Sequence, residues 1–313
     1  MTDIIPTNQS RYQLTTEGLK SMQDIVIDGL NSPYSKVMYA KAINDFLVWR
    51  NDAGGGPFVK AQVNAYKAHL LSATDYAPST INLRLSAIRK LAAEAADNGV
   101  MDPHLSEGIQ RVQGVTTHGV RTGNWLTLQQ AQELIRKPDI TTLKGLRDRA
   151  ILTILIGAGL RRSEVANLTF DHIQMREARW LIVDLVGKRR RVRSVPIPAW
   201  TKVAIDAWTQ TANIHEGTLF RSVNKGGNLS GQRMTPQAIA DVVKLYADQC
   251  GFDNLAAHDL RRTYAKLARG GGADLQQIQL SLGHASVKTT ERYLNEVQDL
   301  TSAPCDMIRL QLA

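Results

Sequence analysis

The chain has 313 residues, which is enough for two domains that each bury a core of their own. Its 38 Lys and Arg residues outnumber its 29 Asp and Glu residues, which gives a formal net charge of +9. This charge favours a polyanion such as nucleic acid as a partner, although a soluble protein can also be basic without binding a polyanion. The two cysteines, Cys250 and Cys305, lie far apart, which argues against a disulfide framework and a structural zinc site and fits a reducing cytoplasm.

The apolar runs of the chain are short. The longest one, residues 150–160, falls well below the ~20 residues that cross a bilayer. The start of the chain has no basic stretch followed by an apolar one, so no secretory signal is expected. We therefore expect a cytoplasmic protein that does not bind a membrane.

Residues 33 to about 114 carry a helical pattern throughout. In the first expected helix, apolar residues recur at helical spacing from Val37 to Leu47, and the glycines at 54–56 end it. A second helix follows at about 63–70. The third is expected to start at Ser79 and Thr80 and to close at Asn98-Gly99, and a short fourth lies between 102 and 112. This pattern predicts an N-terminal domain of four helices, residues 1–113.

The third helix carries Arg84, Arg89 and Lys90 on the face opposite its apolar one. Compact helices with basic outer faces suit a clamp on DNA, but a charged surface on a small helical domain is often only solvated. If the clamp interpretation holds, neutralising Arg84 together with Arg89 should weaken DNA binding and flatten its dependence on salt.

Residues 114–124 contain three glycines and no periodic pattern, so we expect a linker there and a second domain over 125–313. Thr127 is a plausible N-cap, and Thr235 followed by Pro236 marks another helix start, with Gly251 at its end. Between them, residues 178–198 read as a strand, a tight turn at Gly187-Lys188 and a second strand. The whole chain is thus expected to be mainly α, with an α+β second domain that holds a small antiparallel sheet.

Six side chains in the second domain together suit phosphoryl transfer without a metal or other cofactor, because they supply cations, a proton donor, imidazoles and a nucleophile. They are Arg161, Lys188, His258, Arg261, His284 and Tyr293. Each also has an ordinary structural interpretation. Arg161 follows two glycines and could grip phosphate oxygens in a fork, or could simply begin the next helix.

The turn at Lys188 is crowded with positive charge. Five of the six residues from 188 to 193 are cationic, among them Arg189, Arg190 and Arg191. Such a turn can contact phosphates, although a basic hairpin is often solvated.

The remaining four positions lie near helix ends. His258 and Arg261 are spaced i, i+3, which a helix places on one face, either around an anion or merely at a capped helix start. His284 follows a helix that Gly283 ends, and it could cap that helix. Tyr293 lies on a helix that Ser286 could cap, where a tyrosine is more often part of the core.

The order and spacing of these motifs resemble the tyrosine recombinase (phage integrase) family. The motifs are GLRRSE at 159–164, GK before a VP strand, HDLR at 258–261, LGH at 282–284 and a tyrosine nine residues after that histidine. The first domain is similar in size and helix count to the family's core-binding (SAM-like) domain, and the organisation resembles the Xer type. Two positions depart from the common pattern: Arg262 stands where many members have histidine, and Arg162 adds charge beside Arg161.

The resemblance implies a role for each residue. Arg161 and Arg261 would clamp the scissile phosphate, Lys188 would protonate the 5′ leaving oxygen and Tyr293 would be the nucleophile. His258 would take part in proton transfer from the tyrosine, and His284 would hydrogen-bond the phosphate. Glu164 would help to hold the site together.

The resemblance also implies site-specific recombination of double-stranded DNA at an inverted-repeat core site, in integration, excision or resolution. Strands would be cut and rejoined through a 3′-phosphotyrosine and a Holliday junction, by a homotetramer or heterotetramer whose C-terminal tail, residues 299–313, docks on a neighbouring subunit. Such an enzyme would act in the cytoplasm at the nucleoid. The alternatives are a type IB topoisomerase, which religates the original strand, and a DNA-binding regulator without catalysis.

Overall fold

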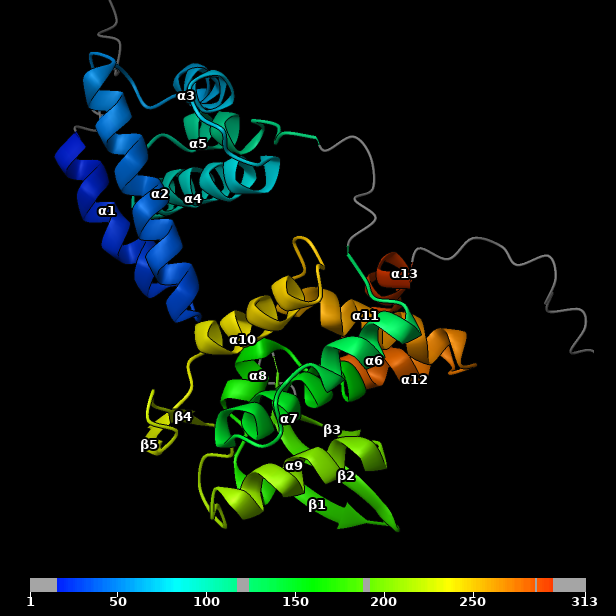
Figure 1. Ribbon diagram of the computed structural model, residues 1–313. Coiled ribbons are helices and arrows are strands. Elements are labelled where there is room, and N and C mark those ends of the chain that lie inside the picture. The colour runs from blue at the N-terminus through cyan, green and yellow to red at the C-terminus, as the bar shows by residue number, and fades with distance from the viewer. Residues whose placement is uncertain (1–15, 117–123, 188–191, 285, 295–313) are drawn as a thin grey trace, which may run out of the picture. The chain divides into compact units, whose positions relative to one another are not determined.

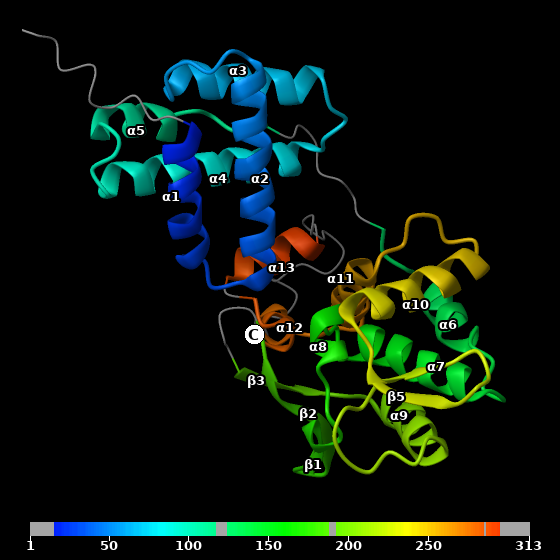
Figure 2. The same ribbon diagram turned by 90° about the vertical axis from the view of Figure 1, so that its left-hand side faces the viewer.

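The computed structural model describes residues 16–116, 124–187, 192–284 and 286–294. The chain divides into two compact units, residues 1–120 and 121–313 (Figures 1 and 2). This division falls within the segment 114–124. Each unit has a separate hydrophobic core and is described by itself.

The described part of the N-terminal unit consists of five helices. The four helices that the sequence predicts are present, and a further helix precedes them because Leu19 and Val26 bury an apolar face in the same core. Figure 2 shows α1 beside α2. The bounds are α1 Thr16–Asp28, α2 Pro33–Asp52, α3 Lys60–Ser72, α4 Pro78–Asp97 and α5 Pro103–Gln110.

Helix α4 contacts each of the other four helices and carries much of the core of this unit. Its start corrects the prediction that Ser79 and Thr80 precede it. Ala77 is the N-cap, and Pro78 occupies the first helical position, where its missing N–H costs nothing. Its end is confirmed at Asn98, followed by Gly99 at a φ of 71°.

Arg84 is not on an outer face, which corrects the expectation for this residue. Only 5% of it is exposed, because α4 is surrounded by other helices. Its Nη2 forms an ion pair with Asp45 at 2.7 Å and donates to the Tyr76 hydroxyl at 3.1 Å, and Nη1 donates to the Tyr66 hydroxyl at 3.4 Å. The guanidinium thus links α4 to α2 and α3 inside the unit.

The other two basic residues of α4 are also engaged within the unit. Arg89 is half-buried and its Nη2 donates to the Val112 carbonyl oxygen, which ties α4 to the segment after α5. Lys90 pairs with Glu94 one turn later at 2.8 Å. The face that the sequence suggested as a DNA clamp is therefore occupied largely by internal contacts.

The C-terminal unit is mostly helical, with two small antiparallel sheets. Its first half contains α6 Leu128–Arg136, α7 Leu143–Gly157, α8 Arg162–Ala166, the short 3-10 helix η2 Phe170–His172, β1 Ile173–Arg176, β2 Arg179–Val186, β3 Val192–Pro196 and α9 Ala199–Thr211. Its second half contains β4 Arg221–Val223, β5 Leu229–Arg233, α10 Pro236–Gln249, α11 Ala257–Gly270, α12 Leu275–Leu282 and α13 Val287–Leu294.

The cap signals read from the sequence are confirmed in this unit. Thr127 accepts from the backbone of Gln130 in a capping box, and Thr235 caps α10 with Pro236 at its first position. Gly251 follows α10 at a φ of 70°, and Gly283 ends α12 in the left-handed conformation. Each of these residues acts on backbone groups within a few residues of itself, so its role depends little on the rest of the fold.

Helix α7 runs through the middle of the unit and is buried along most of its length. Helices α6, α8, α9, α10 and α11 pack around it. A Cβ on Gly157 would lie 2.4 Å from the Thr201 hydroxyl, so glycine is required where α9 crosses the end of α7. The buried Asp148 on α7 accepts from the Tyr246 hydroxyl of α10 at 3.0 Å, which links these two helices.

The three-stranded sheet confirms the two paired strands expected at 178–198, while the tight turn expected at Gly187-Lys188 lies partly outside the described residues. β2 pairs antiparallel with β3, with Ile182 opposite Val195 and Val186 opposite Val192, and β1 adds a third strand. A bulge between Ile182 and Leu185 lies at Asp184, whose φ is 55°. The register brings the two ends of the turn, Val186 and Val192, side by side. The β4–β5 pair forms a second sheet that the sequence did not predict.

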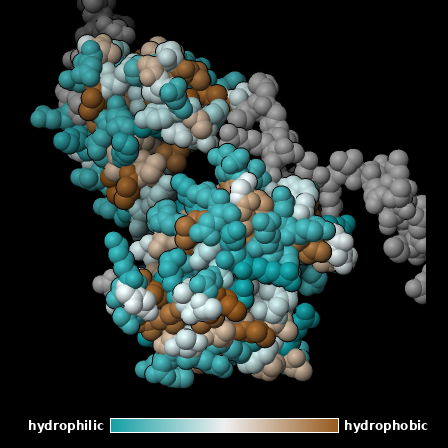
Figure 3. Space-filling model, in the orientation of Figure 1, coloured by the Kyte–Doolittle hydropathy of each residue, from teal (hydrophilic) through white to brown (hydrophobic). Residues whose placement is uncertain are grey.

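The face of the described residues shown in Figure 3 is mainly polar. Apolar patches interrupt it, including over α9, where Trp200 and Val203 are exposed. Within the described residues, every helix is too short or too polar to span a membrane.

Candidate active site

Arg161 sits at the start of α8, after a turn that only glycine allows. Gly159 has a φ of 60°, and a Cβ there would lie 2.5 Å from the Tyr264 ring. Arg161 is the N-cap of α8: its backbone N–H donates to Glu164 Oε2 at 2.9 Å and its Nη1 donates to Glu164 Oε1 at 2.7 Å. About a quarter of the Arg161 side chain, 27%, stays exposed, so the guanidinium is fixed at one end and open to a ligand at the other.

Glu164 is a buried carboxylate shared by two guanidiniums. Besides Arg161 it accepts from Arg193 Nη1 at 3.0 Å and Nη2 at 2.9 Å. Burial alone would raise the pKa of Glu164, but the hydrogen bonds and charges of the two arginines lower it to about 2. Glu164 is therefore ionised at neutral pH and bonded to both guanidiniums.

Arg261 on α11 is fully buried, with 0% exposure. Its Nη1 donates to the Gly159 carbonyl oxygen at 2.6 Å, and its Nη2 donates to the Leu282 carbonyl oxygen. The side chain thus connects the turn before Arg161 to the end of α12, just before His284. Two predicted site regions more than a hundred residues apart meet at this guanidinium.

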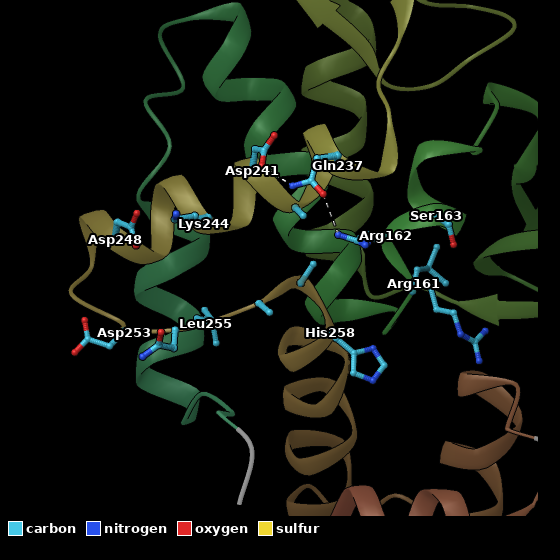
Figure 4. A pocket seen from close by; sticks show the side chains of 15 residues that line it. Arg161, Arg162, Ser163, Gln237, Asp241, Lys244, Asp248, Asp253, Leu255 and His258 are labelled. Carbon is cyan, nitrogen blue, oxygen red and sulfur yellow. Dashed lines mark hydrogen bonds between the residues drawn. The ribbon is translucent and has the colours of Figure 1, made fainter. Parts of the chain in front are cut away.

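His258 lies in the first turn of α11 and reaches the surface. Figure 4 shows His258 and Arg161 extending on the same side of the cavity, away from Gln237 and Asp241. Partial burial and the charge of Arg261 lower the pKa of His258 below its ordinary value of 6.5. The imidazole is therefore neutral at pH 7 and able to accept a proton.

His284 follows the left-handed Gly283 and is 8% exposed. Its backbone N–H donates to the Gln279 carbonyl oxygen at the end of α12, at 3.2 Å. Its Nδ1 lies 2.9 Å from the Thr290 hydroxyl of α13. Burial is the largest cause that lowers the pKa of His284 to about 4. Further lowering comes from the positive charges of Arg261, Arg161 and Arg193 and from the electrostatic effect of the neighbouring His258.

Two of the six predicted catalytic positions lie partly or wholly outside the described residues. Lys188 and its neighbours Arg189, Arg190 and Arg191 are in the turn between β2 and β3 that is not described. The backbone of Tyr293 belongs to α13, which packs on α11 and α12 through the buried Thr290 and Leu294. Arg161, His258, Arg261 and His284 are the four whose side chains are described and brought together.

Two residues that contact this site were not singled out from the sequence. Arg193 was counted only as one of the cations of the basic hairpin, and Thr290 was not considered. A signal for Arg193 was present, since it shares one face of β3 with the buried Val195 two residues later. Thr290 lies three residues before Tyr293 in the sequence of α13.

A cavity of about 830 Å³ opens beside Arg161 and His258, between α8, α10 and the start of α11 (Figure 4). Arg162 at its rim lies 3.5 Å from Gln237, which in turn donates to Asp241 at 2.8 Å. Within the part of the chain that the structure describes, no three His, Cys, Asp or Glu side chains are grouped to hold a metal ion. The fixed positive groups of this region suit a bound anion such as a phosphate.

Comparisons with known proteins show the family. The profile of the Phage integrase family matches residues 124–299. Tyrosine recombinase XerC of Myxococcus xanthus is 32% identical over 237 residues, which cover 70% of this chain and 72% of that protein. Tyrosine recombinase XerD of Xanthomonas axonopodis pv. citri is 27% identical over 274 residues, which cover 82% and 84%.

Two solved structures share the fold. The XerH site-specific recombinase bound to a palindromic difH substrate, in a post-cleavage complex, matches with a TM-score of 0.69 and 16% identity, over 92% of this chain and 82% of that one. A lambda integrase dimer bound to a COC′ core site matches with a TM-score of 0.68 and 12% identity, over 90% and 78%.

Proposed function

The chain belongs to the phage integrase family and is a tyrosine site-specific recombinase, and from this premise we propose that Tyr293 attacks a DNA phosphate held by Arg161 and Arg261. One observation carries the proposal. Arg261 donates to the carbonyl oxygens of Gly159 and Leu282, so a single guanidinium joins the turn that presents Arg161 to the helix end that presents His284.

The proposed step transfers a phosphoryl group between two oxygens. The phenol oxygen of Tyr293 bonds to phosphorus as the bond from phosphorus to the 5′ oxygen breaks, which leaves a 3′-phosphotyrosine and a free 5′-hydroxyl. The phenol proton passes to His258, and Lys188 gives a proton to the leaving oxygen. Arg161 and Arg261 spread the additional negative charge of the pentavalent arrangement.

Neutral imidazoles suit this scheme. The lowered pKa of His258 leaves it unprotonated at pH 7 and able to accept the tyrosine proton. His284, with a pKa of about 4, is also neutral. In our proposal the Thr290 hydroxyl donates to His284 Nδ1, so that the ring carries its proton on Nε2 and donates it to the phosphate.

The covalent intermediate retains the energy of the phosphodiester. A 5′-hydroxyl from a partner strand can therefore reverse the step without ATP and produce a Holliday junction. We propose a substrate of double-stranded DNA with an inverted-repeat core site, in integration, excision or resolution, with the enzyme acting at the nucleoid in the cytoplasm. The palindromic site bound by XerH and the core site bound by lambda integrase support this substrate.

We also propose that four subunits act together in a ring, with the tail at 299–313 docked on a neighbouring subunit. Its apolar residues Met307, Ile308 and Leu310 support this arrangement, and the tail itself lies outside the described residues. Deleting residues 300–313 should prevent synapsis of two DNA sites while leaving the binding of one site intact. Normal assembly and strand exchange in the deletion variant would remove the tail from this proposal.

The test is a suicide substrate built from DNA that flanks the gene, in which a nick lets the cleaved strand end diffuse away. The wild-type protein should form an adduct that survives denaturation, with the DNA 3′ end linked to Tyr293, and Tyr293→Phe should bind the same DNA and form none. An adduct formed by Tyr293→Phe would overturn the assignment of the nucleophile. Relaxation of supercoiled DNA without exchange would indicate a topoisomerase, and binding without any adduct would indicate a regulator.

A further inference from the structure

Arg193 on β3 lies at the centre of a network behind the site. Its Nη1 and Nη2 donate to the two oxygens of Glu164 at 3.0 and 2.9 Å, and its Nε donates to the Ser281 carbonyl oxygen at 2.8 Å. Its side chain is only 10% exposed. All three guanidinium nitrogens therefore engage α8 and α12, two elements that each present a proposed catalytic residue.

The first branch of this network leads to Arg161. Glu164 accepts from Arg193 and from Arg161 with the same two oxygens, so a movement of the carboxylate moves both guanidiniums. A carboxylate bonded in a fork on one side has little freedom to rotate. Arg193 thus limits the positions that the Arg161 guanidinium can take.

The second branch leads to His284. Arg193 holds the carbonyl oxygen of Ser281, and Arg261 holds that of Leu282, so two arginines fix consecutive carbonyls at the end of α12. Cations at this end of a helix also interact favourably with its dipole. Gly283 then packs on the Arg193 side chain, since a Cβ there would lie 3.0 Å from Arg193 Cδ.

We propose that Arg193 is a positioning residue for DNA cleavage, which acts on Arg161 through Glu164 and on His284 through the end of α12 without touching the phosphate. Arg193 is the second residue of β3, so a regular strand holds its backbone in place. This inference rests on the proposed function. Lysine cannot replace it, because one ammonium cannot reproduce a fork to a carboxylate and a third bond to a carbonyl in this geometry.

The first measurement compares Arg193→Gln and Arg193→Lys with a control on the same sheet. Arg176→Gln removes an exposed guanidinium that bonds to Gln174 on β1. In single-turnover cleavage of a suicide substrate at saturating DNA, we expect both Arg193 variants to be ~10- to 100-fold slower, because small misplacements of clamping groups are costly. DNA affinity and the control rate should stay within about twofold of the wild type, which is the scatter of independent sites. Wild-type cleavage rates in the Arg193 variants would overturn the proposal.

A double variant tests whether Arg193 acts through Glu164. Arg193→Gln combined with Glu164→Gln should cleave about as fast as the slower single variant, because both changes break the same link. If the double variant instead loses the product of the two single losses of cleavage rate, the two residues act independently and the proposed route through Glu164 is contradicted. Arg193→Lys gives the same comparison if Arg193→Gln does not fold.

A third measurement needs no DNA and no catalysis. Nuclear magnetic resonance titration of the histidine rings should show a higher pKa for His284 in Arg193→Gln than in the wild type, because a nearby cation is lost and the end of α12 is released. An unchanged pKa of His284 would overturn the proposed link to α12. If the wild type forms no adduct, the proposed function fails, while this titration still decides the role of Arg193.

Discussion

Both units of this recombinase bury an arginine, but they surround it differently. In the N-terminal unit Arg84 pairs with the carboxylate of Asp45 at 2.7 Å, and two tyrosine hydroxyls complete its contacts. In the C-terminal unit Arg261 donates to the main-chain carbonyl oxygens of Gly159 and Leu282. A carboxylate cancels the charge of a guanidinium, whereas a carbonyl dipole orients it and leaves its charge in place.

This difference affects the pKa values of the histidines near Arg261. Arg261 contributes to the lowered pKa of both His258 and His284, so its positive charge extends into the site. Glu164 likewise serves two guanidiniums with a single negative charge. For these two buried arginines, the type of partner separates the one whose charge is balanced inside the fold from the one whose charge extends into the site.

The largest expected effect tests this contrast directly. Arg261→Gln should slow single-turnover DNA cleavage by ~100- to 1000-fold, the usual loss when one donor to a transition-state oxyanion is removed. Arg84→Gln should leave the cleavage rate of the folded protein unchanged. Measuring both variants with a suicide substrate, at a temperature where each is folded, gives the comparison. Equal losses of cleavage rate in the two variants would contradict the proposed difference between the two arginines.

The next effect concerns acid stability. The pKa of Glu164 is about 2 in the folded chain, below its ordinary value of 4.5, so its stabilisation is complete above pH 4.5 and is lost as the pH falls toward 2. This contribution is about 3 kcal/mol by linkage. In Glu164→Gln, denaturant unfolding between pH 6 and 3 should show a shallower loss of stability than in the wild type. If the free energy of unfolding falls equally with pH in both proteins, Glu164 is not the source of the loss of stability in acid.

A smaller effect is expected at Thr290. Thr290→Val keeps the shape of the side chain and removes the hydroxyl that lies 2.9 Å from His284 Nδ1. The loss of one hydrogen bond, about 1 kcal/mol, should slow cleavage roughly fivefold without a change in DNA affinity. Thr289→Val, at an exposed neighbouring position on α13, is the matched control. A control that slows cleavage as much would point to a general disturbance of the helix.

The smallest expected effect sharpens the contrast between buried and exposed cations. Arg162 is exposed at the rim of the cavity beside the site. Arg162→Gln should reduce the slope of log affinity against log salt by about one, as expected for a phosphate contact. Arg84→Gln should leave this slope unchanged and instead lower the free energy of unfolding. A reduced slope in Arg84→Gln would restore it as a DNA contact.

Local chemistry made several features predictable from the sequence. Thr127, the Thr235-Pro236 pair and Gly283 act on backbone groups within a few residues of themselves, so their roles do not depend on the rest of the fold. The paired strands around residues 187–191 follow from a similar short-range pattern. The order of the recombinase motifs, each weak alone, determined the family.

Tertiary structure decided where each cation and its partner lie. The carboxylate that pairs with the buried Arg84 belongs to Asp45 on another helix, α2. The carboxylate that pairs with Arg193 belongs to Glu164 on α8. No local pattern in the sequence encodes such pairs, because they form only when distant segments pack together. The sequence therefore determined which chemical groups this protein has and where several of its helices begin or end, while packing decided which of its arginines support the fold and which hold the site.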